Sequence, residues 1–196
     1  MLRKLVPLAT EIRAQTFAVD ASDPVAVARL FDDTDTRLGE PDVVVYNAAT
    51  APAHGPMAEL DAEAVRRAIE ISAYGGFLVV QQAARRMIPH GRGAILLTGA
   101  SASVKGYPRS AIFAMGKFAL RGLAQATARE LAPQGIHVAH FVIDGGVRSA
   151  RRPDPAERPD STLDPDAIAQ TYLEALRQPR SAWSLEVELR PWVETF

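Results

Sequence analysis

The 196-residue chain contains no cysteine, and this absence excludes a disulfide framework, a thiolate nucleophile and a thiolate-bound zinc ion. Charge of one sign is not in excess, because the formal net charge is -1 and the arginines are scattered among acidic residues. No basic stripe therefore predicts a nucleic-acid partner. The sequence has no uncharged run of membrane-spanning length. Charged residues interrupt residues 1–14, which excludes a signal-peptide core there. We expect a cytoplasmic protein that binds neither nucleic acid nor a membrane.

Short β-branched apolar runs alternate with longer helical patterns along the whole chain. Hydrophobic residues make up 47% of the sequence, enough for one sizeable core, so we expect a single domain over residues 1–196. The predicted strands are 16–20, 42–47, 93–98, 136–143 and 185–189. A first helix is predicted to start within 22–31, and the other predicted helices are 61–88, 109–132 and 164–176. Ser22 is the expected N-cap of the first of these helices, with Pro24 in its first turn. This order predicts a doubly wound parallel sheet in a three-layer α/β/α arrangement.

Several short motifs follow the predicted strands in a fixed order. Asn47-Ala48-Ala49 ends one strand, the segment 72–78 lies in the next helix, and G-A-S-A-S (99–103) follows the next strand. Phe113 and Lys117 are then one helical turn apart, and D-G-G-V (144–147) follows a later strand. Each motif is weak alone, but the ordered set resembles the short-chain dehydrogenase/reductase family from about residue 10 to the end of the chain. The resemblance implies a Rossmann-type fold.

The resemblance also implies hydride transfer between NAD or NADP and a small-molecule carbonyl or alcohol substrate. In this family a tyrosine is the general acid or base, and a lysine one turn later lowers its pKa and holds the nicotinamide ribose. Lys117 matches that lysine, whereas Phe113 stands at the tyrosine position and has no proton to give. Ser101 is the nearest match to the serine that holds the carbonyl oxygen, and Ser72 stands where the family has an asparagine.

The remaining positions that match the family are cofactor contacts. Asp20 and Ala21 would lie near the adenine, Asn47, Ala48 and Ala49 near a ribose, and Gly145 and Val147, with Lys117, near the nicotinamide. No metal site is predicted, because His137 and His140 are three apart in a strand and point to opposite faces.

The family's glycine-rich turn, which binds the cofactor pyrophosphate, has no match in the sequence. The chain is therefore predicted to be N-terminally truncated by about one βαβ unit. The two missing strands would separate strand 16–20 from strand 42–47, so either these two pair directly or the chain is a fragment. Without the selecting residues, the choice between NAD and NADP stays open.

Two functions remain open from the sequence. The first is an NAD(P)-dependent oxidoreductase that is weak or inactive as given; the second is a non-catalytic member that binds a ligand or a partner subunit. We also expect a homodimer or tetramer formed through helices 61–88 and 109–132. Five residues are expected on the exposed apolar surface of the second helix: Ala119, Leu120, Leu123, Ala124 and Ala128. Structural alternatives are that Lys117 is an ordinary surface lysine, that Phe113 is a packed ring, and that Ser101 and Ser103 only satisfy loop backbone.

Overall fold

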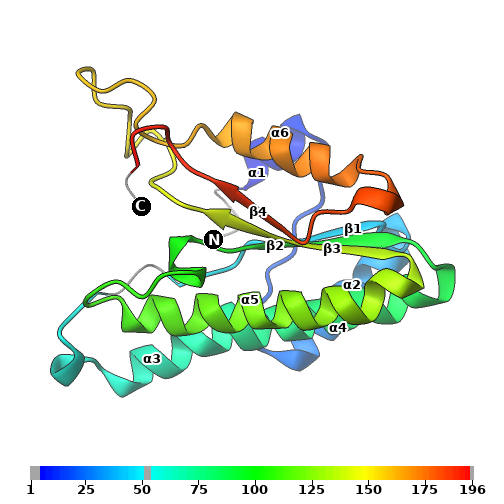
Figure 1. Ribbon diagram of the computed structural model, residues 1–196. Helices are drawn as coiled ribbons and strands as arrows, with labels where there is room; N and C mark the ends of the chain where they lie inside the picture. The colour runs from blue at the N-terminus through cyan, green and yellow to red at the C-terminus, as the bar shows by residue number, and fades with distance from the viewer. Residues whose placement is uncertain (1–4, 51–53, 195–196) are drawn as a thin grey trace.

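The computed structural model describes residues 5–50 and 54–194, and its centre is a four-stranded parallel sheet (Figure 1). The strands are β1 (Val43–Tyr46), β2 (Gly93–Thr98), β3 (Ile136–Ile143) and β4 (Glu186–Leu189), in the order β1-β2-β3-β4. In the register, Tyr46 is opposite Leu97, and Ile143 is opposite Leu189. Because all the strands are parallel, their carboxyl ends meet at one edge of the sheet.

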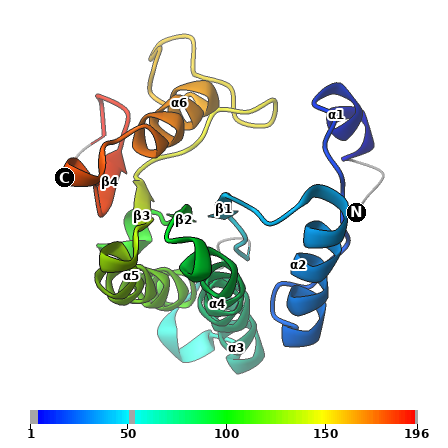
Figure 2. The ribbon, with the colours of Figure 1, turned by 90° about the vertical axis from the view of Figure 1, so that its right-hand side faces the viewer.

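Helices cover both faces of this sheet, which confirms the predicted three-layer, doubly wound architecture (Figure 2). One face carries α3 (Ala62–Ile69), α4 (Gly75–Met87) and α5 (Ala111–Leu131), and the other carries α6 (Pro165–Leu176). Two further helices, α1 (Val6–Glu11) and α2 (Pro24–Leu38), lie beyond β1, α1 toward the side of α6 and α2 toward the side of α4. In the described part of the chain, no helix is both long and apolar enough to cross a membrane.

The apolar strands divide their side chains between two core clusters. Ile95 and Leu97 of β2 pack in the cluster under α4 and α5, whereas Leu96 packs in the cluster under α6. Phe141 of β3 joins the α6 cluster and is fully buried. Alternate residues of one strand therefore serve opposite layers, which explains why these runs contain no polar alternation.

The predicted strand at 16–20 does not form. Residues 14–20 have no regular secondary structure, so the strand predicted at 16–20 is wrong, and the alternative in which it pairs directly with the strand beginning near residue 42 does not occur. Val43 and Val45 of β1 are 42% and 50% exposed, and within residues 5–50 and 54–194 no strand pairs with the outer edge of β1. A segment of alternating apolar residues forms a strand only when a neighbouring strand hydrogen-bonds to its backbone. No described strand is paired with residues 16–20.

The first predicted helix begins one residue later than expected. Asp23, not Ser22, is the N-cap of α2, because its Oδ1 accepts hydrogen bonds from the backbone N–H groups of Val25 (2.8 Å) and Ala26 (3.2 Å). Ser22 instead donates its hydroxyl to Asp20 Oδ1 at 2.6 Å. Pro24 occupies the first turn as predicted, since that position needs no backbone donor.

The long helix predicted at 61–88 is interrupted by one wide turn. A π-helical segment, Glu70–Tyr74, separates α3 from α4 and contains Ser72, which is 2% exposed. A Cβ atom at Gly116 of α5 would lie 2.8 Å from Cβ of Ser72. Glycine at 116 therefore allows α5 to pack directly against the turn that holds Ser72.

The outer surface of α4 and α5 carries apolar side chains, but only some of the expected residues lie on it. Ala119 is exposed as expected, and Leu123 is partly buried against the core. Leu120 and Ala124 are fully buried and Ala128 is 9% exposed, so these three belong to the core because the helical period turns them toward the sheet. The exposed apolar side chains are Tyr74, Phe77, Met115 and Phe118, each between 42% and 48% exposed.

Candidate active site

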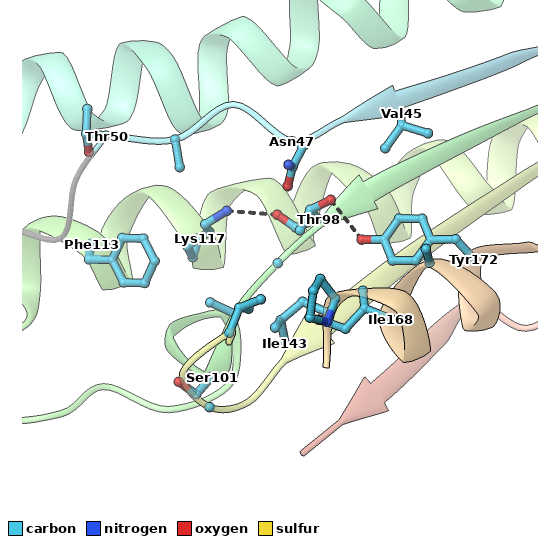
Figure 3. Close-up of a pocket in the computed structure, with 17 residues that line it drawn as sticks. Val45, Asn47, Thr50, Thr98, Ser101, Phe113, Lys117, Ile143, Ile168 and Tyr172 are labelled. Atoms are coloured by element: carbon cyan, nitrogen blue, oxygen red, sulfur yellow. Dashed lines mark hydrogen bonds between the residues drawn. The ribbon is translucent and has the colours of Figure 1, made fainter. Parts of the chain in front are cut away.

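A cavity of about 580 Å³ lies at the carboxyl ends of β1, β2 and β3 (Figure 3). Its walls come from these strand ends and from α5 and α6, and they are mostly apolar, including Val45, Ile143, Val147 and Ile168. The carboxyl edge of an open α/β sheet is the usual place for a ligand, because the loops that follow the strands gather there. The cavity is therefore the candidate site.

Lys117 is the charged residue of this cavity. Its side chain is only 3% exposed, and its Nζ donates a hydrogen bond to the backbone carbonyl oxygen of Thr98 at 2.8 Å. Burial lowers the pKa of Lys117 from 10.5 to about 8, because the charged form loses its hydration. No carboxylate is found among the described residues that line the cavity. Lys117 is thus a buried amine facing an apolar space, not an ordinary surface lysine.

Phe113 lies one turn before Lys117 on the same helix face. Its ring is half-buried, lines the cavity, and has its centroid 5.8 Å from Lys117 Nζ. The ring supplies a wall and a weak cation–π contact where the family has a phenol. Phe113 is therefore both a packed ring and a part of the candidate site.

The structure separates the two serines that follow β2. Ser103 is fully buried, and its Oγ accepts a hydrogen bond from the backbone N–H of Ala100 at 3.1 Å, so it satisfies loop backbone. Ser101 lines the cavity, as does Ala100. Of the two, Ser101 is the serine placed to meet a ligand.

Most of the predicted cofactor residues come together at the carboxyl edge. Asn47, Ala49, Gly145 and Val147 line the cavity with Lys117. Ala21 and Ala48 instead line a neighbouring hollow of about 280 Å³ beside β1, to which Asn47 also contributes.

Two predicted site residues, Asp20 and Ser72, line neither space. The pKa of Asp20 is lowered by the hydrogen bonds from Ser22, which occupy its carboxylate. Ser72 lies in the turn packed on Gly116, as described above. The roles of these residues toward a cofactor or substrate stay predictions.

Tyr172 and Thr98 line the cavity but were not predicted from the sequence. Tyr172 Oη and Thr98 Oγ1 are 2.8 Å apart, and Figure 3 shows Lys117 and Tyr172 reaching Thr98 from opposite sides. The ring of Tyr172 stacks on Phe141 at 3.7 Å between centroids, and burial raises the pKa of its hydroxyl. The sequence predicted a helix over 164–176, but not that this helix covers the carboxyl ends of the strands.

A buried ion pair holds two loops of the site together. Asp144 is 2% exposed and lies 3.4 Å from Lys105 Nζ and 3.4 Å from Arg190 Nη2. Lys105 belongs to the loop after β2, and Asp144 begins the turn that carries Gly145. Gly145 has φ of 150°, and a Cβ there would lie 2.8 Å from Pro191, so only glycine fits this turn without strain.

The two histidines of β3 have separate, structural partners. His137 Nε2 lies 2.9 Å from the carbonyl oxygen of Ser184, and His140 Nδ1 lies 3.1 Å from Glu186 Oε2. Among the residues that the structure describes, no group of three His, Asp or Glu side chains is arranged to hold a metal ion.

Comparison with known proteins places this architecture and this order of motifs in one family. A family model described as enoyl-(acyl carrier protein) reductase matches residues 2–160. A solved short-chain dehydrogenase from Rhodopseudomonas palustris is 34% identical, with a TM-score of 0.83 over 97% of this chain and 82% of that chain. An alcohol dehydrogenase from Thermococcus sibiricus, solved with 5-hydroxy-NADP, is 23% identical with a TM-score of 0.83, covering 99% of this chain and 83% of that one.

Among curated proteins, L-2,3-butanediol dehydrogenase from Corynebacterium glutamicum is 32% identical over 133 residues. The match covers 67% of this chain and 51% of that protein, so the chain spans about half the length of the curated relatives it matches. The family model covers most of the sequence, and the Rhodopseudomonas structure matches almost all of it. The chain belongs to the short-chain dehydrogenase/reductase family.

Proposed function

We propose that the cavity is the active site of an NAD(P)-dependent oxidoreductase that acts on a small apolar carbonyl or alcohol, with low activity. The observation that carries this proposal is the buried Lys117, held by Thr98 at the carboxyl edge of the sheet and facing a largely apolar cavity. In the family the matching lysine holds the nicotinamide ribose. The apolar walls favour a substrate with a hydrocarbon body.

The residues around the cavity fit the nicotinamide half of a dinucleotide. Lys117 and Asn47 offer hydrogen-bonding groups for ribose hydroxyls, and the Gly145 turn has no side chain to block a flat ring. A bound nicotinamide cofactor would supply or accept the hydride. The chain's own part is to bind the substrate, orient its carbonyl and exclude water.

The pyrophosphate half lacks a comparable site in the described residues. Pro165, the first residue of α6, borders the cavity, but the carboxylate of Asp164 caps this helix by accepting from the N–H of Asp166 at 2.9 Å. A carboxylate at that position repels a phosphate and occupies the N–H that would bind it. We infer that the chain as given holds a dinucleotide only weakly.

Proton transfer is the second weakness of the site. Phe113 has no hydroxyl, and Ala100 has none either. Ser101 is therefore the serine of this loop that lines the cavity. General acid or base help is worth roughly 10²- to 10⁴-fold in rate. These replacements are the reason that the proposed activity is low. The alternative, in which the cavity binds a ligand without turning it over, differs from the proposal in having no measurable hydride transfer.

Cofactor titration tests the binding step. We expect saturable but weak binding of NADH or NADPH, with a Kd on the order of 100 µM or more, because only one half of the cofactor is held. Nicotinamide fluorescence and calorimetry would measure it, and Lys117→Met is expected to weaken it further by about tenfold.

The matched control is Arg129→Met, which removes an exposed cation from the same helix, α5, without touching the lining of the cavity. A low-micromolar Kd for the wild-type chain would contradict the weak-binding expectation. Equal binding by wild type and Lys117→Met would contradict the assignment of Lys117 to the ribose.

We also propose that the chain forms a homodimer or tetramer through α4 and α5. Tyr74, in the turn before α4, and Phe77 of α4 are exposed, and their rings stack at 6.2 Å between centroids. Met115 and Phe118 of α5 are exposed as well. C₂ pairing is the commonest way to cover such a surface.

Phe118→Glu is expected to shift the mass from dimer or tetramer to monomer in light scattering at roughly 50 µM, because it would bury a charge in the interface. Val25→Glu is the control, since Val25 is 70% exposed on α2, away from this surface. A monomeric wild-type chain would refute the proposal.

A further inference from the structure

The buried amine of Lys117 has an environment that differs from that of every other described lysine. The sequence contains three lysines, Lys4, Lys105 and Lys117. Lys105 is about one-third exposed and paired with Asp144, whereas Lys117 is 3% exposed and bonded to a neutral carbonyl oxygen. Lys4 lies outside the described residues. Lys117 therefore combines burial, a neutral partner and direct contact with an open cavity.

None of the described residues that line the cavity offers Lys117 an anionic partner. Tyr172 of α6 is the other titratable residue of that lining, and Lys117 also lowers the pKa of His140 of β3, although burial is the largest cause of that shift. Phe113 offers only its ring, 5.8 Å from Nζ. The cavity's described lining holds no carboxylate, and with its pKa lowered to about 8 roughly a tenth of Lys117 is the free amine at pH 7, far more than for a lysine of ordinary pKa.

A free lysine amine in an apolar pocket is the usual requirement for imine formation with a carbonyl compound. The volume of about 580 Å³ leaves room for such a ligand beside Nζ, and Val45, Ile143 and Ile168 give it apolar walls. We propose that Lys117 forms a covalent imine with apolar aldehydes or ketones that enter this cavity, independently of any nucleotide.

The reaction balances without an oxidant or reductant. The nitrogen lone pair attacks the carbonyl carbon, a C–N bond forms, and a proton moves from nitrogen to oxygen to give a carbinolamine. Loss of water then breaks the C–O bond and leaves a C=N bond, the two amine protons departing with the carbonyl oxygen. Ser101, whose hydroxyl can donate a hydrogen bond to that oxygen, lines the same cavity.

Reductive trapping tests this proposal on the chain as it exists. The protein is incubated with benzaldehyde and sodium cyanoborohydride, without nucleotide, and the benzylated residue is located by proteolysis and mass spectrometry. We expect modification of Lys117 at least about tenfold faster than of Lys105 or Lys4, because it presents far more free amine. Equal or slower modification of Lys117 would overturn the proposal.

Two variants separate reactivity from misfolding. Lys117→Arg keeps a cation able to donate to Thr98 and loses the reactive amine, so the fast adduct should vanish while the circular dichroism spectrum is kept. Lys105→Arg should leave the fast adduct unchanged. If Lys117→Arg does not fold, the mapping of the wild-type adduct still decides the question. This outcome is independent of cofactor binding, so its failure and the failure of the oxidoreductase proposal are distinguishable.

Discussion

Phe113→Tyr is expected to raise the rate of carbonyl reduction by up to about 100-fold, measured by absorbance of the reduced cofactor at millimolar concentration. The change places a hydroxyl one turn from Lys117, whose charged form lowers the pKa of a nearby phenol. The half-buried ring of Phe113 already faces the cavity, so the new hydroxyl enters the ligand space. The expected gain in rate is near the lower limit of the usual range for general acid catalysis. Ser72 stands in place of the family's asparagine, and Ser101, next to Ala100, is only the nearest match to its serine.

The double variant Phe113→Tyr/Lys117→Met is the control. If the two groups act as a unit, it should lose the whole gain, and the effects will not be additive. Tyr172→Phe, which removes the other phenol of the cavity, should keep most of it. A Phe113→Tyr variant that binds cofactor but shows no gain on apolar aldehydes, cyclic ketones or secondary alcohols would show that positions 113 and 117 are not a disabled catalytic pair.

Lys117→Met is expected to change how stability depends on pH. Burial lowers the pKa of Lys117 from 10.5 to about 8 in the folded chain. Below pH 8 the folded and unfolded chains both carry the proton, and the full cost of the buried charge is present. Between pH 8 and 10.5 the unfolded chain binds more protons, so the wild-type free energy of unfolding rises with pH by roughly 3 kcal/mol relative to Lys117→Met.

Urea unfolding at pH 7, 8, 9 and 10 measures this difference. Comparing the two proteins cancels the titration of distant groups that they share, and His140, whose pKa is lowered from 6.5, does not titrate between pH 8 and 10.5. Met also leaves the Thr98 carbonyl without its donor, a cost of about 1–3 kcal/mol that affects the absolute difference but not its slope with pH. Parallel stability curves from pH 8 to 10.5 would mean that Lys117 is hydrated in the folded chain.

The three layers of this fold were predictable because short segments of sequence determine which residues form strands and which form helices. The apolar runs of β2 and β3 have both faces buried, and helix α6 begins at a residue preceded by its own cap, Asp164. Phe113 and Lys117 were predictable as neighbours because a helix sets their separation.

Pairing and packing over long sequence distances explain what the sequence did not reveal. The segment 16–20 has strand-like residues, but whether it forms a strand depends on a partner at the edge of β1. Tyr172 meets Thr98 only because α6 crosses the carboxyl ends of the strands, 74 residues away in sequence. Leu120 and Ala124 were placed on the wrong surface because an almost wholly apolar helix does not indicate which face is covered.

The most direct test of the oxidoreductase proposal is deuterium transfer from NADPH labelled at the nicotinamide C4 position. The wild-type chain, Phe113→Tyr and Lys117→Met would each be incubated with millimolar labelled cofactor and apolar aldehydes or cyclic ketones, and the product alcohols analysed by mass spectrometry. We predict deuterium on the carbonyl carbon above the protein-free level with the wild-type chain, more with Phe113→Tyr and less with Lys117→Met. Absence of deuterium from every product with both the wild-type chain and Phe113→Tyr would contradict the assignment of this cavity as a hydride-transfer site.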